Sequence, residues 1–184
     1  MKFFAYPVIA ALATCSVAVH ADEFSVFGPT VRPGARLAET HVFNGFGCNG
    51  RNRSPALTWK NPPMETKSFA VTMYDPDAPT GSGWWHWVVY NIPASTHGLL
   101  EGVGSADGRQ LPRGAVQGHT DFGIVGYGGA CPPAGDKHHR YIITIHALKV
   151  EHLDLPPDAS AAMVGFMLNA NRLGIATLQA SYSR

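Results

Sequence analysis

The sequence lacks most of the compositional signals that would mark a nucleic-acid-binding, disordered or repetitive protein. Its 14 Lys and Arg residues are matched by 13 Asp and Glu residues, which leaves a formal net charge of +1. This balance gives no support for binding to nucleic acid or to an anionic membrane, so a charged ligand must be bound by local groups. We also find no repeat, linker or low-complexity segment. With 184 residues, 45% of them hydrophobic, the chain is expected to bury one core in one domain.

Long hydrophobic runs are also scarce, and the one that stands out lies at the N-terminus. Lys2 is followed by an apolar run over residues 3–19, and the letters VHA then end at Ala21. A positive start, a short apolar stretch and small residues before a cleavage point are typical of a secretory signal peptide. We therefore expect residues 1–21 to be a signal peptide that is removed after Ala21. Residues 22–184 would then form the folded domain of a periplasmic or secreted protein without a stable membrane span.

Two other interpretations of the N-terminus stay open. The apolar run could be an uncleaved anchor, although Pro7 and His20 weaken it as a spanning helix. A lipid could also be attached to Cys15 in the stretch LATC, although Thr14 is a poor residue to precede a lipidated cysteine.

Cysteine is rare, and its few positions are informative. Removal of the signal peptide takes away Cys15 and leaves Cys48, in NGFGCNG, and Cys131, in GYGGACPP. Paired thiols in an exported chain are usually oxidised, so we expect a disulfide between these two glycine-rich loops. Two free thiols are the alternative, because a sequence does not show whether the two Cα atoms come within bridging distance.

Most of the chain after the signal peptide shows the period-two pattern of β-strands. The clearest segments are rich in β-branched and aromatic residues and are bounded by glycine and proline. They cover residues 69–73, 87–92 and 140–148, with weaker candidates at 24–29, 41–46 and 177–183. The 20 glycines and 14 prolines predict long ordered loops between the strands. The expected fold is therefore mainly β, in one domain.

One segment, residues 159–172, predicts a helix near the C-terminus. Met163, Phe166, Met167 and Ala170 are spaced as one helical face. Asp158 or Ser160 could cap the N-terminus of this helix. We interpret the two methionines as packing residues of the core.

Three polar residues fall at the ends of apolar strand rows. Asp75 ends the row that begins at residue 69, His86 starts a row shared with Val88 and Tyr90, and His139 starts the row that continues at residue 141. If these strands pair in antiparallel fashion, the carboxylate and the two imidazoles converge at one edge of the sheet. Tryptophans at 84 and 85 and a tyrosine at 141 would surround them, which is the composition of a small ligand site.

Each of these features also has a purely structural explanation. The stretch DPDAP is good turn chemistry, because aspartate side chains accept hydrogen bonds from backbone N–H groups two residues on. The pair His138-His139 lies beside Lys137 and Arg140 and could be a solvated basic turn. The tryptophans could simply be core residues.

Four motifs together resemble the phosphatidylethanolamine-binding protein (PEBP) family, most closely its bacterial Raf-kinase-inhibitor-like branch. They are SPALTW at 54–59, DPDAP at 75–79, WWHWVVYNI at 84–92 and GGACPPAGDKHHRY at 128–141. The resemblance implies a PEBP-like β-sandwich of a large and a small antiparallel sheet, with a helix in the C-terminal region and long ordered loops. It also implies a small pocket for anions such as phosphate, acetate or a phospholipid head group.

The resemblance also implies which residues bind the ligand. Asp75, His86 and His139 would form the centre, Ala78 and Pro79 a wall, Trp84 and Tyr141 the mouth, and the loop from Gly129 to Pro132 the floor. Imidazole N–H groups donate to anionic oxygens, and glycines let backbone N–H groups approach a phosphate. Because a nearby Asp75 favours charged imidazole, we expect affinity for phosphate-like ligands to rise as the pH falls toward about 6. Cys131 departs from the family pattern, in which glycine is usual at that position.

Catalysis and metal binding receive less support from the sequence. It has no G-x-S-x-G signature, and a Cys131–His139 pair would be disabled by a disulfide. The two histidines and Asp75 lack H-x-x-x-H spacing, so we expect neither a metal nor a cofactor. We therefore expect a small anionic or phosphorylated ligand, bound by a monomer or homodimer. A hydrolase, or an inhibitor or effector that acts on a protein partner through its surface loops, is the alternative.

Overall fold

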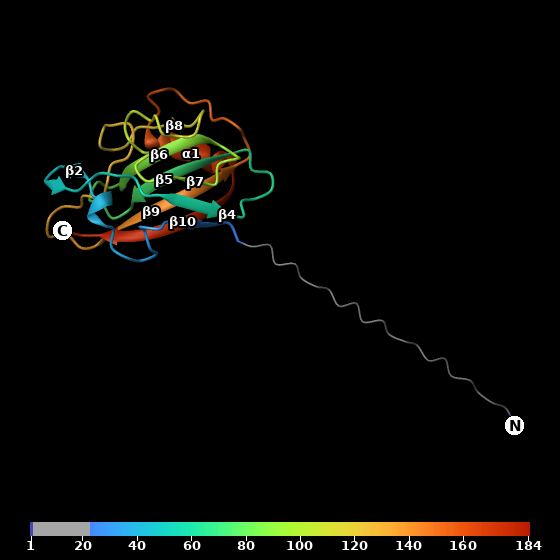
Figure 1. Cartoon of the computed structure of the whole chain (residues 1–184), viewed down its shortest axis with the longest axis horizontal. Coiled ribbons are helices and arrows are strands. Elements are labelled where there is room, and N and C mark those ends of the chain that lie inside the picture. The colour runs from blue at the N-terminus through green and yellow to red at the C-terminus, as the bar shows by residue number, and fades with distance from the viewer. Residues whose placement is uncertain (2–22) are drawn as a thin grey trace.

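The strand-forming segments pair into three antiparallel sheets. The computed structural model describes Met1 and residues 23–184, so the predicted signal peptide lies outside the described residues apart from Met1. The central sheet has the order β10-β9-β5-β6-β8. Its strands are β5 (Ser68–Asp75), β6 (Trp84–Pro93), β8 (Val116–Gln117), β9 (His139–Leu148) and β10 (Arg172–Tyr182). Figure 1 shows the long strands β5, β6 and β9 side by side, as their pairing requires.

Two smaller sheets accompany the central one. The first has the order β1-β4-β7, formed by β1 (Ser25–Phe27), β4 (Leu57–Lys60) and β7 (Gly98–Leu99). The second is the hairpin of β2 (Asn44–Gly45) and β3 (Cys48–Asn49), which follows the 3-10 helix η1 (Glu39–His41). The expected mainly-β fold with a large and a small antiparallel sheet is confirmed.

The large sheet is buried on both faces. One face packs against the small sheet in a core that includes Trp59, Phe69, Trp87 and Ile145. The other face is covered by α1 (Ala161–Asn171). Because both faces are covered, β5 is buried almost throughout and does not alternate between buried and exposed residues.

The predicted helix forms, and the predicted core packing of its two methionines holds for Met167, which is partly buried against the helix-side core, but is wrong for Met163. Ser160 caps α1 by accepting a hydrogen bond from the backbone N–H of Met163 at 3.1 Å. The buried residues of α1 are Ala161, Val164 and Leu168, whereas the side chains of Met163 and Phe166 are 47% and 71% exposed. The helix is apolar on more than one face, so its sequence did not reveal which face docks onto the sheet.

The predicted strand at residues 41–46 is also largely wrong. His41 ends the 3-10 helix η1, Val42 forms a single bridge with Ala130, and only residues 44–45 are in a strand. Phe46 then has a φ of +52°, a conformation that breaks extended structure. The period-two pattern of this segment therefore reflects a loop that passes over the core.

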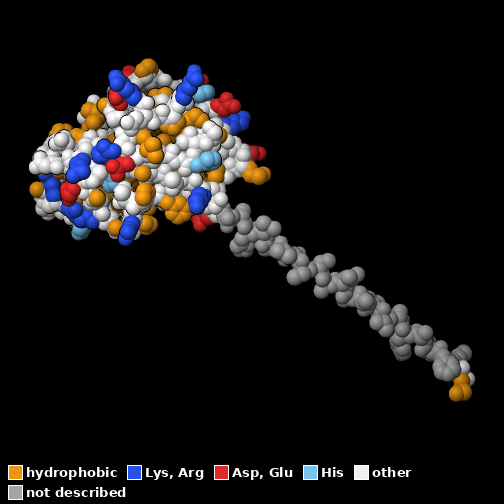
Figure 2. All heavy atoms as spheres, in the orientation of Figure 1, with side chains coloured by type: hydrophobic (Ala, Val, Ile, Leu, Met, Phe, Trp, Pro, Cys, Tyr) orange, Lys and Arg blue, Asp and Glu red, His pale blue; other side chains and the backbone are white. Residues whose placement is uncertain are grey.

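Charges of both signs share the surface of the protein. On the face shown in Figure 2, basic and acidic side chains are interspersed. Among the described residues, no helix is long and apolar enough to cross a bilayer.

Candidate functional site

The structure brings Asp75, His86 and His139 together at one edge of the central sheet. Asp75 is the last residue of β5, His139 is the first of β9, and His86 is the third of β6. Because β9 and β6 flank β5 in antiparallel fashion, the end of β5 meets the beginnings of both neighbours. All three side chains are at most 3% exposed.

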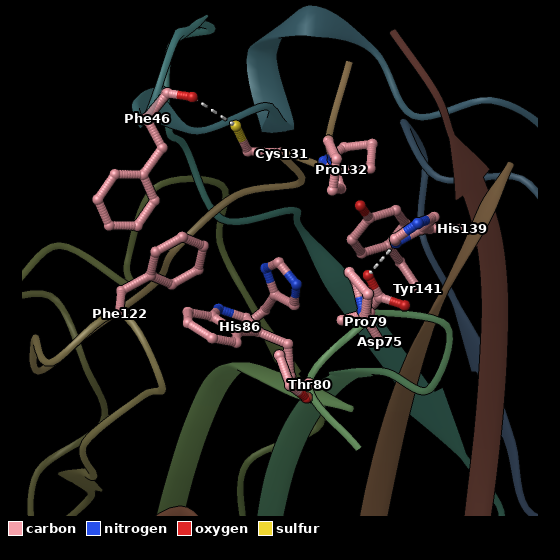
Figure 3. Close-up of a pocket in the computed structure, with 13 residues that line it drawn as sticks. Phe46, Asp75, Pro79, Thr80, His86, Phe122, Cys131, Pro132, His139 and Tyr141 are labelled. Atoms are coloured by element: carbon pink, nitrogen blue, oxygen red, sulfur yellow. Dashed lines mark hydrogen bonds and ion pairs between the residues drawn. The ribbon is translucent and has the colours of Figure 1, made fainter. Parts of the chain in front are cut away.

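A cavity of about 220 Å³ opens between these residues (Figure 3). Its walls come from the strand ends and from three loops. The lining residues are Phe46, Asp75, Ala78, Pro79, Thr80, Trp84, His86, Phe122, Cys131, Pro132, Pro133, His139 and Tyr141. Eight of the nine residues named as ligand-binding candidates thus line one cavity, and Gly129 is the exception.

The predicted face of His86 is wrong. Val88 and Tyr90 face α1 on the opposite side of the sheet, where they belong to the helix-side core. His86 instead points into the cavity, and its ring lies edge-on to Tyr141 with 5.1 Å between the ring centroids. Strict alternation along β6 would have turned the imidazole away from the site.

A β-bulge causes this reversal. Met73 pairs with Trp87, but the next residue of β5, Tyr74, pairs with Trp85. His86 is therefore an extra residue in β6 without a partner across the ladder. Bulges of this kind re-aim side chains near functional sites, and this one adds an imidazole to the cavity without breaking the sheet.

His139 lies between two carboxylates. Its Nδ1 is 2.7 Å from Oδ2 of Asp75, and its Nε2 is 3.1 Å from Oδ2 of Asp136. Carboxylates accept hydrogen bonds, so both ring nitrogens act as donors when the imidazole is charged. Burial opposes that charge, but the hydrogen bonds to the two carboxylates outweigh burial and raise the pKa of His139. This site therefore favours an imidazolium.

His86 has the opposite character. Its Nδ1 is 2.8 Å from the carbonyl oxygen of Gly128 and 3.1 Å from that of Gly129. Complete burial lowers the pKa of His86, despite these carbonyls and the charge of Asp75. The expectation that both imidazoles gain charge in mild acid is therefore wrong for His86, because desolvation dominates there.

The aspartates of DPDAP hold the edge of the site in place. Oδ1 of Asp75 accepts a hydrogen bond from the backbone N–H of Asp77 at 2.8 Å. Asp77 in turn binds the guanidinium of Arg140 through two bonds of 2.8 and 2.9 Å, which lower the pKa of Asp77 to about 2. The turn chemistry considered as an alternative is thus present, and it positions Asp75 in the cavity.

The other candidates take different places from those expected. Tyr141 is fully buried in the wall and does not lie at the mouth. The Tyr141 hydroxyl and Trp84 Nε1 have no hydrogen-bond partner among the described residues. Gly129 lies behind His86, and a side chain there would clash with the backbone of His41 and Phe43. Gly129 therefore allows a close backbone approach and does not form the floor.

Several site residues escaped the sequence reasoning. Phe122 stacks on Phe43 with 4.3 Å between ring centroids, and its edge approaches Trp84 and His86 at 5.3 Å each. Phe46 completes this aromatic wall and is 69% exposed. Phe122 lies in a loop without periodicity, and the period-two pattern that ends at Phe46 predicted a strand and not a cavity wall, so neither residue was expected at the site. Asp136 lies within the resembling motif, three residues before His139, and that spacing was the available signal.

The predicted disulfide is confirmed. Cys48 and Cys131 are bonded, with 6.0 Å between their Cα atoms. The bond ties the hairpin that carries Phe46 to the wall formed by Cys131 and Pro132. Among residues 23–184, no group of three or more His, Cys, Asp or Glu side chains is arranged to hold a metal ion.

Comparison with known proteins agrees with the fold and the motifs. Residues 27–183 match the family described as phosphatidylethanolamine-binding protein. UPF0098 protein YbcL of Escherichia coli is 52% identical to this chain over 171 residues, which are 93% of each chain. UPF0098 protein YbhB of the same organism is 53% identical over 153 residues, which are 83% of this chain and 96% of YbhB. The chain therefore belongs to the phosphatidylethanolamine-binding protein family.

Solved structures give the same result. The crystal structure of E. coli YbcL, described as a member of the mammalian PEBP family, superposes with a TM-score of 0.87 at 53% identity and covers 89% of this chain and 99% of that one. A PEBP homologue from Chlamydia trachomatis superposes with a TM-score of 0.72 at 27% identity, covering 88% of this chain and 97% of its own.

Proposed function

We propose that this chain binds a small anion or a phosphorylated head group in the cavity at the edge of the central sheet. We further propose that it does so in the periplasm or outside the cell, after removal of residues 1–21. The single observation that carries the proposal is the buried imidazole of His139, which is hydrogen-bonded to Asp75 and whose pKa is raised, so that it favours the charged form. A cation in a cavity of low dielectric is a strong partner for an anionic oxygen.

The outer nitrogen of His139 supports this role. Its present partner, Asp136, comes from a surface loop, and the Asp136 side chain is 36% exposed. Water can therefore solvate the Asp136 carboxylate when it leaves Nε2, so that a ligand oxygen can take its place on this nitrogen. Asp75 would remain in place and keep the ring oriented.

The size and lining of the cavity support a small ligand. Its volume of about 220 Å³ lies below that of pockets for drug-sized molecules, which start near about 300 Å³. The hydroxyl of Tyr141 and Nε1 of Trp84 are buried donors without protein partners among the described residues. Unsatisfied buried donors are costly, and a bound oxyanion would offer them an acceptor. The family's description as phosphatidylethanolamine-binding is consistent with this class of ligand.

Titration calorimetry with inorganic phosphate and with phosphoethanolamine tests the proposal. We expect His139→Ala to weaken binding roughly ten- to hundred-fold, the usual value of a charge-assisted hydrogen bond. His138→Ala is the matched control, because His138 is exposed and bonds only to Ser183 among the described residues. If His139→Ala binds as tightly as the wild type, the assignment of the anion site is wrong.

Covalent catalysis by Cys131 has little support. Its sulfur is bonded to Cys48 and is not a free thiolate, which is the form that attacks a substrate. The proposal is therefore for binding without a cysteine nucleophile.

A further inference from the structure

The second imidazole of the cavity carries information about the ligand that the anion proposal does not use. Nδ1 of His86 is within hydrogen-bonding distance of two backbone carbonyl oxygens, those of Gly128 and Gly129. Carbonyl oxygens only accept hydrogen bonds, so Nδ1 must carry the proton. In the neutral ring, Nε2 is then left with a lone pair and acts as an acceptor.

The surroundings of His86 keep the ring neutral and open toward the cavity. The side chain lies between Phe122 and Tyr141, whose ring centroids are 5.3 and 5.1 Å away, and it is 3% exposed. Nε2 makes no hydrogen bond to any described residue, and Figure 3 shows the ring directed into the cavity. A ligand group that reaches this nitrogen must supply a hydrogen.

The remaining polar groups of the cavity require hydrogen-bond acceptors on the ligand. His139 offers a cation, and the Tyr141 hydroxyl and Trp84 Nε1 offer hydrogens. A ligand that satisfies the whole site therefore accepts hydrogen bonds on one side and donates a hydrogen bond on the other. A fully ionised oxyanion has only lone pairs, and one of its oxygens would face the lone pair of His86.

We propose that the cavity selects oxyanions that retain a proton, namely inorganic phosphate or the monoanion of a phosphate monoester, and rejects fully ionised ones such as sulfate. In this arrangement an anionic oxygen accepts from Nε2 of His139, and the P–OH group donates to Nε2 of His86. The inference rests on the proposed anion site and assigns His86 as the residue that determines specificity within it.

Phosphate and sulfate form a matched pair of probes. Both are tetrahedral, and near neutral pH phosphate carries one or two protons whereas sulfate carries none. We expect calorimetry at pH 7 and fixed ionic strength to give phosphate roughly ten- to hundred-fold tighter binding than sulfate, because a site with an unpaired buried group rejects the analogue that cannot pair with it. Equal affinities for the two ions would overturn the inference and leave the anion site standing. If neither ion binds, the proposed function itself fails.

Substitution of His86 tests the assigned residue. In His86→Ala the acceptor is lost, so phosphate should bind more weakly while sulfate does not, and the ratio of the two affinities should fall toward one. His86→Gln preserves more of the side-chain volume and can turn an amide N–H toward the ligand, so it should also reduce the ratio. A merely structural role would weaken both ions alike. A ratio that stays at its wild-type value in both folded variants would therefore contradict the proposal.

A third probe separates the two possible sources of the hydrogen. Glycerophosphoethanolamine is a phosphodiester without a P–OH group, but it carries an ammonium group that could donate instead. We expect the wild-type protein to bind glycerophosphoethanolamine at least tenfold more weakly than it binds phosphate. Binding as tight as that of phosphate would show that an ammonium group supplies the hydrogen and would overturn the selection for a protonated oxyanion.

Discussion

Loss of the disulfide between Cys48 and Cys131 should cost a large part of the stability of this protein. The two cysteines are 83 positions apart, and the bond closes this long loop in the unfolded chain. In the chain-entropy account, a loop of that length restricts the unfolded state by about 4.5 kcal/mol, and removal of native disulfides usually costs about 2 to 5 kcal/mol. For a domain of this size each kcal/mol lowers Tm by about 2 to 4 °C.

A second link holds the hairpin in place when the disulfide is lost. The side chain of Arg184 bridges the same two segments as the disulfide, through 2.7 Å bonds from Nε to the carbonyl of Pro132 and from NH1 to the carbonyl of Gly47. We therefore expect Cys48→Ala/Cys131→Ala to remain folded, with the hairpin still held beside the cavity. Adding Arg184→Met to this double variant should release the hairpin that carries Phe46 and weaken phosphate binding.

Equilibrium urea unfolding of the oxidised wild type, the reduced wild type and the double alanine variant measures this cost. The reduced wild type is the control, because it breaks the bond without changing the side-chain carbon skeleton. A loss below about 1 kcal/mol in the double variant would refute the loop-closure argument. Thiol titration of the denatured, non-reduced protein should find no free thiol among residues 22–184.

Two further predictions concern the N-terminus and the acid side of the stability curve. N-terminal sequencing of the native protein should start at Asp22, and recovery of Met1 in a cytoplasmic fraction would contradict export. Burial lowers the pKa of His146 to about 4, below its value of about 6.5 in the unfolded chain. Between these values the unfolded state binds more protons, so stability should fall by about 3 kcal/mol as the pH drops through this window. His146→Gln should flatten that part of the pH dependence of urea unfolding, whereas His97→Gln, at an exposed position, should not; equal slopes in His146→Gln and the wild type would contradict the assignment.

Local sequence patterns were enough to predict several features of the fold and the site. Alternation placed Asp75 and His139 at the ends of neighbouring strands, because side chains in a strand point to opposite faces with a period of two. Ser160 was one of two proposed helix caps, since its hydroxyl can accept from the first turn. Cysteine count and expected export identified the disulfide. These features depend on a residue and its near neighbours, so a single sequence was enough to predict them.

The features that the sequence did not determine arise from contacts between distant segments. His86 faces the cavity only because β5 and β6 pair with a bulge, and a shift of register is a property of two strands together. The pKa values of His86 and His139 move in opposite directions because burial dominates at His86, whereas the hydrogen bonds to two carboxylates outweigh burial at His139. Phe122 joins the wall from a loop 36 positions away from His86, as the sequence numbering shows.

The exposed face of α1 is a similar case. An apolar helix offers several faces, and docking onto the sheet selected Val164 and Leu168 for burial over Met163 and Phe166. The sequence by itself thus determined the long strands β5, β6 and β9, the helix and the three polar side chains at the strand ends, because local sterics and periodicity set them. Only the tertiary structure decided which way His86 points and which protons the two imidazoles hold, because burial and long-range pairing set the free energy of each charge.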